Sequence, residues 1–198
     1  MLRSTIAVVV LAMVGGLFAN VASITFELGN QQVGATQAMS LGGVVYVHPY
    51  MRGIGGLGGL IAVKMATKSY DDKTVSGSTT TTTSMSIGGF AIDILAAPFA
   101  EIGKADGIIY PMFGITILSG KEKYESGGTT TEYDYGTNLG FAFGVGGEIY
   151  IMRNICISGK LVRRLVTGVM ETEYGTYTEK QDVPIGGSDA SFGIGVSF

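Results

Sequence analysis

The sequence predicts an all-β protein, an eight-stranded antiparallel up-and-down transmembrane β-barrel that is preceded by a signal peptide. Three observations predict this fold. Apolar residues alternate with Gly, Ser and Ala along most of the chain, which is the period of strands and not of helices. Short and long connections follow one another in turn. The chain also ends on an alternating run whose last residue is aromatic.

The first residues have the three-part layout of a secretory signal. Arg3 precedes an apolar run over 6–18, and small residues then lead to a cut after Ser23. The apolar run is shorter than the about 20 residues of a bilayer span, which disfavours the alternative of a retained anchor helix. The sequence therefore predicts a signal peptide at 1–23 and one barrel domain at 24–198.

Successive alternating runs predict the strands. In the sixth run Phe141 and Phe143 fall on one face, while Gly140, Ala142 and Gly144 fall on the other. The connections after the second, fourth and sixth runs are short, and those after the third, fifth and seventh are long and polar, as in transmembrane barrels. The eight expected strands are 24–33, 38–50, 58–71, 84–99, 108–124, 137–151, 154–172 and 188–198.

The two faces of these runs differ in an informative way. Phe and Ile occupy one face, and Gly, Ser and Ala occupy the other. Eight strands enclose a lumen just wide enough for side chains, so small residues suit its inside and apolar residues suit lipid. A soluble lipocalin-like barrel is the alternative, but it would expose a large apolar patch to water. Aromatic residues near both strand ends predict two interfacial belts, formed by Tyr70, Tyr124, Tyr133, Tyr135, Tyr174 and Tyr177 at one end and Tyr50, Phe99, Tyr110 and Phe198 at the other.

The last run carries the one specific motif. From Ala190 onward, Phe192, Ile194, Val196 and Phe198 alternate with Ser and Gly up to the C-terminus. In this strand the chain resembles the small outer-membrane barrel family typified by OmpX and the OmpA membrane domain. The resemblance implies a location in the bacterial outer membrane among lipid and lipopolysaccharide, with both termini in the periplasm. It also implies that the barrel-assembly machinery recognises the strand ending on Phe198.

Carried through each strand, the alternation also places charged residues on the inner face. A lone buried charge is expensive, so three acids and three bases inside a lumen are expected to pair. We expect Glu148 to reach Lys160 on the next strand, and Arg164 to reach either Asp93 or Glu27 across the bore. Such a network either plugs the lumen or forms a gate whose ion pairs exchange partners. The six residues are Glu27, Lys64, Asp93, Glu148, Lys160 and Arg164.

Several functional classes are disfavoured. A single Cys156 allows no intrachain disulfide, and a single His48 allows no multi-histidine zinc site. In lipid A deacylases a His-x-Ser pair acts with an acid, but here His48 is followed by Pro49 and Tyr50. Thirteen basic against sixteen acidic residues argue against nucleic-acid binding. We expect no enzyme activity and no cofactor; an unrecognised lipid-modifying enzyme is a further alternative.

Two further patterns have low specificity. A formal G-x-G-x-x-G at Gly53, Gly55 and Gly58 precedes a strand-like run, whereas a nucleotide-binding loop opens a helix. The run of Ser and Thr over 78–84 predicts a solvated loop tip, or a surface for an extracellular ligand of the long loops. The sequence thus favours a structural or surface-interaction barrel with a plugged lumen; the alternative is a narrow OmpW-like channel for small solutes.

Overall fold

The computed structural model describes residues 21–34, 36–48, 55–76, 79–102, 106–152, 154–174 and 177–198, without the side chains of residue 21, 75–80 and 171–179. Residues 1–20 of the expected signal peptide lie outside the described residues. The first strand already begins at Val21. Within it, Ala22 exchanges backbone hydrogen bonds with Phe198 (N···O 3.3 and 2.9 Å), so a cut after Ser23 would remove this pair.

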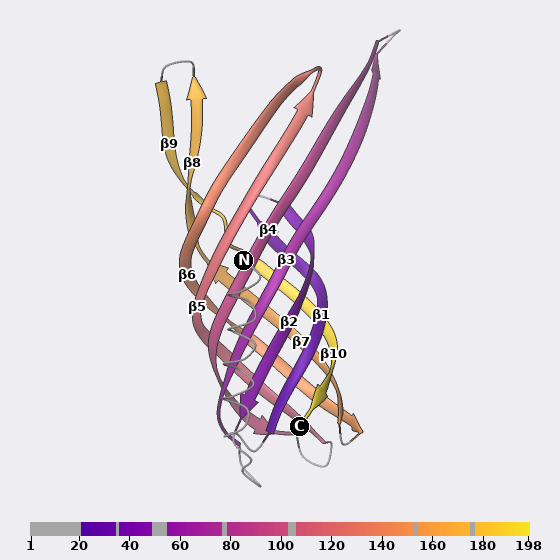
Figure 1. Cartoon of the computed structure of the whole chain (residues 1–198), viewed down its shortest axis with the longest axis vertical. Coiled ribbons are helices and arrows are strands. Elements are labelled where there is room, and N and C mark those ends of the chain that lie inside the picture. Colours follow the sequence, from indigo (N-terminus) through magenta and orange to yellow (C-terminus); the bar gives the residue numbers. More distant parts are fainter. Residues whose placement is uncertain are drawn as a thin grey trace.

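Eight strands close into the barrel, each antiparallel to its neighbours (Figure 1). Around the ring their order is β1, β10, β7, β6, β5, β4, β3, β2, so the last strand closes the barrel against the first. A separate hairpin, formed by β8 (Thr167–Tyr174) and β9 (Tyr177–Pro184), lies between β7 and β10 in the chain. The barrel strands are β1 (Val21–Val33), β2 (Thr36–His48), β3 (Gly56–Ser76), β4 (Thr79–Glu101), β5 (Gly107–Ser126), β6 (Thr129–Met152), β7 (Ile155–Leu165) and β10 (Ser188–Ser197).

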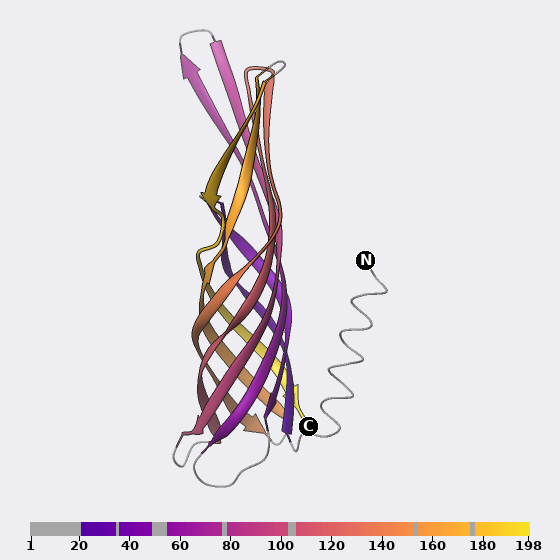
Figure 2. The ribbon, with the colours of Figure 1, turned by 90° about the vertical axis from the view of Figure 1, so that its left-hand side faces the viewer.

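Four strands continue well past the ring. β3 pairs with β4 up to Ser76 and Thr79, and β5 pairs with β6 up to Ser126 and Thr129. Because β4 also pairs with β5 out to Thr83, these strands form one protruding sheet, which we call the extension. Figure 2 shows it rising from the end of the barrel opposite the C-terminus. We call the end of the barrel that carries the extension the hairpin end, and the end near the C-terminus the terminal end.

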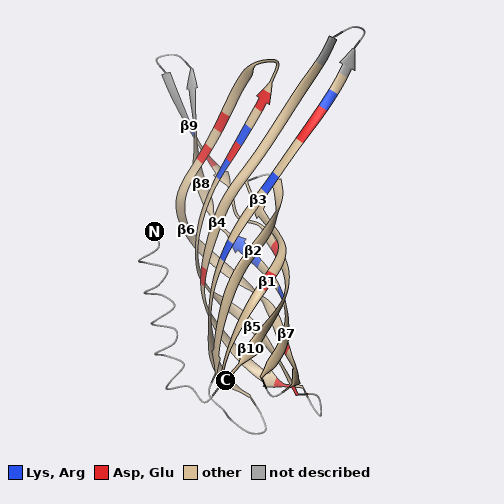
Figure 3. Cartoon of the chain, turned by 45° about the vertical axis from the view of Figure 1, so that its right-hand side comes forward, with Lys and Arg blue, Asp and Glu red and all other residues tan. Residues whose placement is uncertain are grey.

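The outer wall is apolar, as the alternation predicts. Leu139 and Phe141 are 68% and 69% exposed, and Phe113 and Phe192 are 58% and 62% exposed. In Figure 3 many of the charged positions lie along the extension, and most of the barrel ribbon is uncharged. Charged residues of the ring such as Glu27, Lys64 and Arg164 are buried. A girdle of this kind is the surface that a barrel turns to hydrocarbon. Among the described residues, no helix is long and apolar enough to cross a membrane.

The structure corrects the seventh predicted strand and the long loops. The run 154–172 is interrupted at Val166: β7 ends at Leu165, and β8 (Thr167–Tyr174) leaves the ring to pair with β9 (Tyr177–Pro184). The polar segments expected as long loops are largely strand, because Thr and Tyr favour paired strands even outside a membrane.

The predicted aromatic belts are also partly wrong. Phe99, Tyr110 and Tyr135 are only 6%, 0% and 7% exposed and point inward. Position near a strand end does not decide the face of a side chain, whereas parity along the strand does. Tyr50 lies outside the described residues, as do the side chains of Tyr174 and Tyr177.

Candidate functional site: a buried chain of charges in the lumen

The structure places all six sequence-predicted charged residues inside the barrel. None is more than 4% exposed, and each lies on the face of its strand that the alternation indicates. A seventh, Asp189 on β10, is 1% exposed and was missed. The signal was present, because Asp189 is one step of the alternation before Ser191 on the bare face of the last strand.

Six of these residues form one unbranched series of ion pairs in which acid and base alternate, and we call this series the charge chain. Asp93 binds Arg164 (Oδ2–Nη2 2.6 Å), and Arg164 also binds Asp189 (Nη1–Oδ2 3.0 Å). Asp189 in turn binds Lys64 (Oδ1–Nζ 2.9 Å). Lys64 contacts Glu27 (Nζ–Oε2 3.3 Å), and Glu27 ends the chain on Lys160. The order across the lumen is therefore Asp93, Arg164, Asp189, Lys64, Glu27, Lys160.

Glu27 is the most heavily bonded acid of the chain. Besides its two lysines it accepts hydrogen bonds from Ser191 Oγ (2.8 Å) and Ser158 Oγ (3.1 Å). Arg164 is held equally firmly, since its Nε and Nη2 both donate to Asp93 (2.9 and 2.6 Å). Buried charges are tolerated when each is paired and hydrogen-bonded in this way.

The predicted pair of Glu148 with Lys160 does not form. Glu148 instead accepts hydrogen bonds from Ser23 Oγ (2.8 Å) and Tyr150 Oη (3.3 Å). Among the described residues, no basic side chain lies within ion-pair distance of Glu148. Lys160 reaches Glu27 across β10, where Gly193, the residue paired with Glu27, has no side chain; a Cβ there would lie 2.7 Å from Glu27 Cγ.

Apolar and aromatic side chains fill the lumen between the charge chain and the terminal end of the barrel. Tyr46 and Tyr110 stack there, with ring centroids 4.6 Å apart and planes inclined by 17°. His48 packs against the rings of Tyr46 and Phe99 (centroids 5.2 and 4.5 Å apart), which is a structural role. The buried members of this layer include Val44, Tyr46, Leu60, Leu95, Phe99, Ile108, Tyr110 and Met112.

A second apolar layer lies toward the hairpin end. Val33, Leu118 and Ile185 are at most 1% exposed there. The short β1–β2 turn is drawn inward, because Gly34 N donates to the Ile185 carbonyl (3.1 Å). Gly34 has a φ of 58°, and a Cβ there would lie 2.8 Å from Tyr135 Oη, so the turn requires glycine.

Some buried polar groups have no protein partner among the described residues. They are the side-chain amide of Gln31, the hydroxyl of Ser40 and the hydroxyl of Tyr110. Gln31 and Ser40 lie toward the hairpin end and Tyr110 toward the terminal end. Buried polar groups of this kind usually bind internal water.

The extension carries a different, solvated set of charges. Lys121 Nζ binds Asp134 (2.6 Å) and lies 3.7 Å from Glu132, and Lys123 binds Glu125. The hydrogen bond from Lys121 lowers the pKa of Asp134, and that same bond raises the pKa of Lys121. Glu122, on the inner face, is 2% exposed and accepts from Tyr124 Oη (3.0 Å).

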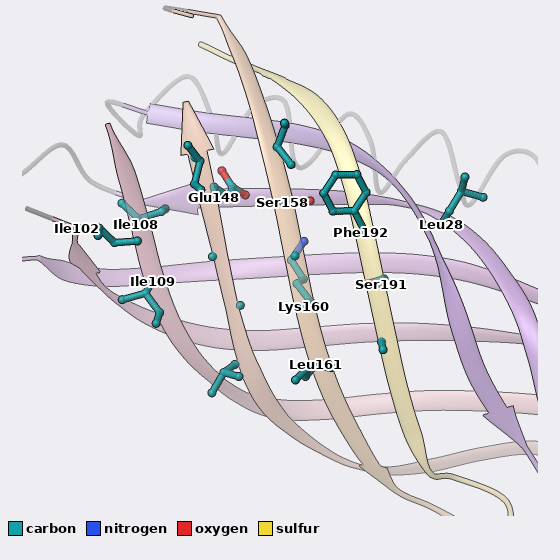
Figure 4. A pocket seen from close by; sticks show the side chains of 17 residues that line it. Leu28, Ile102, Ile108, Ile109, Glu148, Ser158, Lys160, Leu161, Ser191 and Phe192 are labelled. Atoms are coloured by element: carbon teal, nitrogen blue, oxygen red, sulfur yellow. The ribbon is translucent and has the colours of Figure 1, made fainter. Parts of the chain in front are cut away.

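A hollow of about 700 Å³ opens on the outer wall across β5, β6, β7, β10 and β1 (Figure 4). The outward-facing Gly147 and Gly159, which are paired neighbours, form its floor. Ile109, Leu161 and Phe192 form part of its rim. Its lining is largely apolar, like the rest of the lipid-facing wall. Glu148 and Lys160 lie on the lumen side of its floor.

The structure indicates no catalytic or binding role for the remaining sequence patterns. Gly53 lies outside the described residues, and Gly58 lies within strand β3, so no helix follows the glycines. Cys156 is a buried, unpaired thiol. In the part of the chain that the structure describes, no group of three or more His, Cys, Asp or Glu is placed to hold a metal ion.

Comparison with known proteins supports the fold. No model of a protein family and no curated protein sequence matches the chain. Among solved structures, OprG of Pseudomonas aeruginosa is similar with a TM-score of 0.63 and 11% identity, over 89% of this chain and 95% of that one. Ail of Yersinia pestis, in complex with the heparin analogue sucrose octasulfate, is similar with a TM-score of 0.54 and 12% identity, over 91% and 99%. A major outer membrane protein of Thermus thermophilus gives 0.53 and 18%, over 89% and 99%. The chain thus has the fold of small bacterial outer-membrane β-barrels, as predicted.

Proposed function

We propose that this chain is a non-enzymatic outer-membrane barrel with a closed lumen, whose activity lies in its extension. The observation that carries the proposal is the buried chain of six alternating charges between two apolar layers. An ion that crosses the lumen would have to separate these pairs in a low-dielectric interior, which costs several kcal/mol for each pair. The extension, by contrast, presents backbone and charged side chains to water.

The assembly and orientation belong to the same proposal. Phe192 and Phe198 are 62% and 74% exposed, so the last strand presents its aromatic residues outward, where the barrel-assembly machinery would contact them. Lipid and lipopolysaccharide would surround the wall, and the termini would face the periplasm. The extension would then meet extracellular ligands.

A narrow channel is the second candidate, and one observation favours it. The unpartnered polar groups of Gln31, Ser40 and Tyr110 imply water on both sides of the charge chain. The charge chain, together with the apolar layers on either side of it, would then separate two wet regions. Exchange of ion partners within the charge chain, with movement of these apolar side chains, would open a path for small ions.

Planar-bilayer recording of the refolded protein separates the two candidates. A closed lumen predicts no steady conductance for the unmodified protein. Steady, ion-selective conductance of the unmodified protein would refute the closed lumen and establish the channel.

A further inference from the structure

Glu122 on β5 is a buried acid that belongs neither to the charge chain nor to the ion pairs of the extension. It is 2% exposed, and its Oε2 accepts a hydrogen bond from Tyr124, whereas its Oε1 has no hydrogen-bond partner among the described residues. Within the described part of the chain it also forms no ion pair. Lys121 and Lys123, its neighbours in sequence, lie on the opposite face of the sheet, and each binds another acid there. A buried carboxylate without a cation is costly, so Glu122 is suited to take up a cation from outside the chain.

Three tyrosines accompany this carboxylate on the same face of the sheet. Tyr133 is the direct cross-strand neighbour of Glu122 on β6, and its ring meets that of Tyr124 edge-on, with centroids 5.9 Å apart. Tyr135 Oη borders the same small space beside Gly34 as the free Oε1 of Glu122, since a Cβ on Gly34 would lie 2.8 and 2.5 Å from these two oxygens. Electron-rich rings beside a carboxylate are surroundings in which proteins hold organic cations.

A hollow of about 840 Å³ leads to two of these tyrosines, and we call it the tyrosine hollow. It is lined by 130–138 of β6 and by Val169 of β8, where the β8–β9 hairpin diverges from β6 (Figure 1). Tyr133 and Tyr135 belong to this lining and Glu122 does not, so a ligand reaches the carboxylate past the two tyrosines. The volume lies in the range of about 300–1,000 Å³ that is usual for small-molecule sites.

The charges around the tyrosine hollow favour a cation. Its lining contains Glu132 and Asp134 and no basic residue. Over 121–134, where all residues are described, two lysines face four acids, and both lysines are already paired with exposed acids. These charged residues are Lys121, Lys123, Glu122, Glu125, Glu132 and Asp134. Such an excess of acid attracts cations and repels sulfated or phosphorylated compounds.

We propose that the tyrosine hollow binds a small alkylammonium compound whose ammonium group pairs with Glu122. The ammonium donates hydrogen bonds to the free Oε1 of Glu122 and to Tyr135 Oη, and the alkyl chain packs against Tyr133 and Val169. The small-molecule scale of the hollow favours a free amine over the lysine side chain of a partner protein, which carries the same chemistry. The proposal rests on the extension being the interacting part of the protein, and it names the ligand chemistry of that part.

The test titrates the refolded full-length barrel in lipid nanodiscs with n-butylamine at neutral pH and follows the NMR signals of the Glu122 carboxyl carbon and the Tyr135 ring. Both signals are expected to shift and to saturate. The uncharged n-butanol should bind about tenfold more weakly or not at all, because its hydroxyl leaves the carboxylate without a cation. A Gly-Lys-Gly peptide blocked at both ends should bind more weakly than the free amine.

Two matched variants localise the site. Glu122→Gln keeps the shape of the side chain and removes its charge, and should weaken binding of n-butylamine about tenfold or more. Glu125→Gln, at an exposed acid of the same strand, should leave binding within about twofold. The comparison of amine and alcohol on the unmodified protein stands even if Glu122→Gln lowers the yield of folded barrel.

Four results would overturn the proposal: unchanged binding in Glu122→Gln, equal binding of n-butylamine and n-butanol, binding of the lysine peptide alone, or no saturable binding at millimolar amine. These outcomes do not depend on lumen conductance, so they are distinguishable from failure of the closed lumen.

Discussion

Replacing Arg164 tests whether the charge chain holds the barrel together. The guanidinium is 2% exposed and donates to Asp93 twice and to Asp189 once, at 2.6–3.0 Å. Arg164→Met leaves Asp93 with the hydroxyl of Thr116 (2.6 Å) and Asp189 with Lys64, so one carboxylate loses its only basic partner. Removing one partner of a buried pair costs about 3–5 kcal/mol. With a urea slope of about 2 kcal/mol/M, the midpoint should fall by about 1.5–2.5 M.

The matched control is Glu148→Gln, an isosteric change at the buried acid that is not part of the charge chain. The carbonyl oxygen of the new amide would still accept the hydrogen bond from Ser23, so we expect a stability change of about 1 kcal/mol or less. Arg164→Lys keeps the charge but loses the two-pronged bond to Asp93, and should fall between the two. Urea unfolding of each variant in lipid vesicles, followed by gel mobility, gives the values. Similar losses for Arg164→Met and Glu148→Gln would show that ion pairing within the chain does not stabilise the lumen.

Three further outcomes follow from the same geometry. Phe143→Arg, at an outward site paired with Phe113, should destabilise folding into bilayers by about 2–4 kcal/mol, and spin labels at 141 and 143 should report lipid contact; water contact would contradict the assigned face. Deleting Phe198, whose N–H donates to the Ala22 carbonyl (2.9 Å), should lower the amount of heat-modifiable barrel in the outer membrane more than it lowers export, and equal barrel levels would argue against an assembly signal. The Asp134–Lys121 pair has a lowered acid pKa and a raised base pKa, so it should be lost only as pH falls below the usual 3.8 of Asp or rises above the usual 10.5 of Lys; an NMR titration that shows the pair breaking near neutral pH would exclude it.

The alternation predicted the faces of the strands because parity is a local property of an extended chain. A shift of one residue would turn outward residues such as Phe113 and Phe141 inward, so the lumen placement of Lys64 or Arg164 followed directly from sequence. The interruption at Val166 left no such trace. It arises because β8 pairs with β9 in a separate hairpin and does not continue in the ring. Strand propensity along the sequence does not distinguish between these two pairings.

The partners inside the lumen were harder to predict than their placement. Lys160 lies one diagonal step from Glu148 on the adjacent β6, whereas Glu27 lies on β1, beyond β10, so strand adjacency alone favoured Glu148. In a narrow lumen a long side chain also reaches across a strand that has no side chain at the level concerned. The deciding residue is Gly193, and pairing rules for adjacent strands do not consider it.

Glycine on the inner face therefore makes room for the charge chain, and adjacent glycines on β2 allow a direct test. A Cβ on the inward Gly42 would lie 2.7 Å from Lys64 Cγ and 2.3 Å from the Val63 carbonyl oxygen, whereas a Cβ on the outward Gly43 would meet nothing within 4 Å. Gly42→Ala should displace Lys64 from Glu27 and cost about 1–3 kcal/mol, as overpacking does. Gly43→Ala should be neutral, or stabilising by about 0.4–1 kcal/mol, because it restricts the unfolded chain. Both variants are measured by urea unfolding in vesicles. If Gly43→Ala is as harmful as Gly42→Ala, the glycines serve the backbone of β2 and not the space that Lys64 occupies.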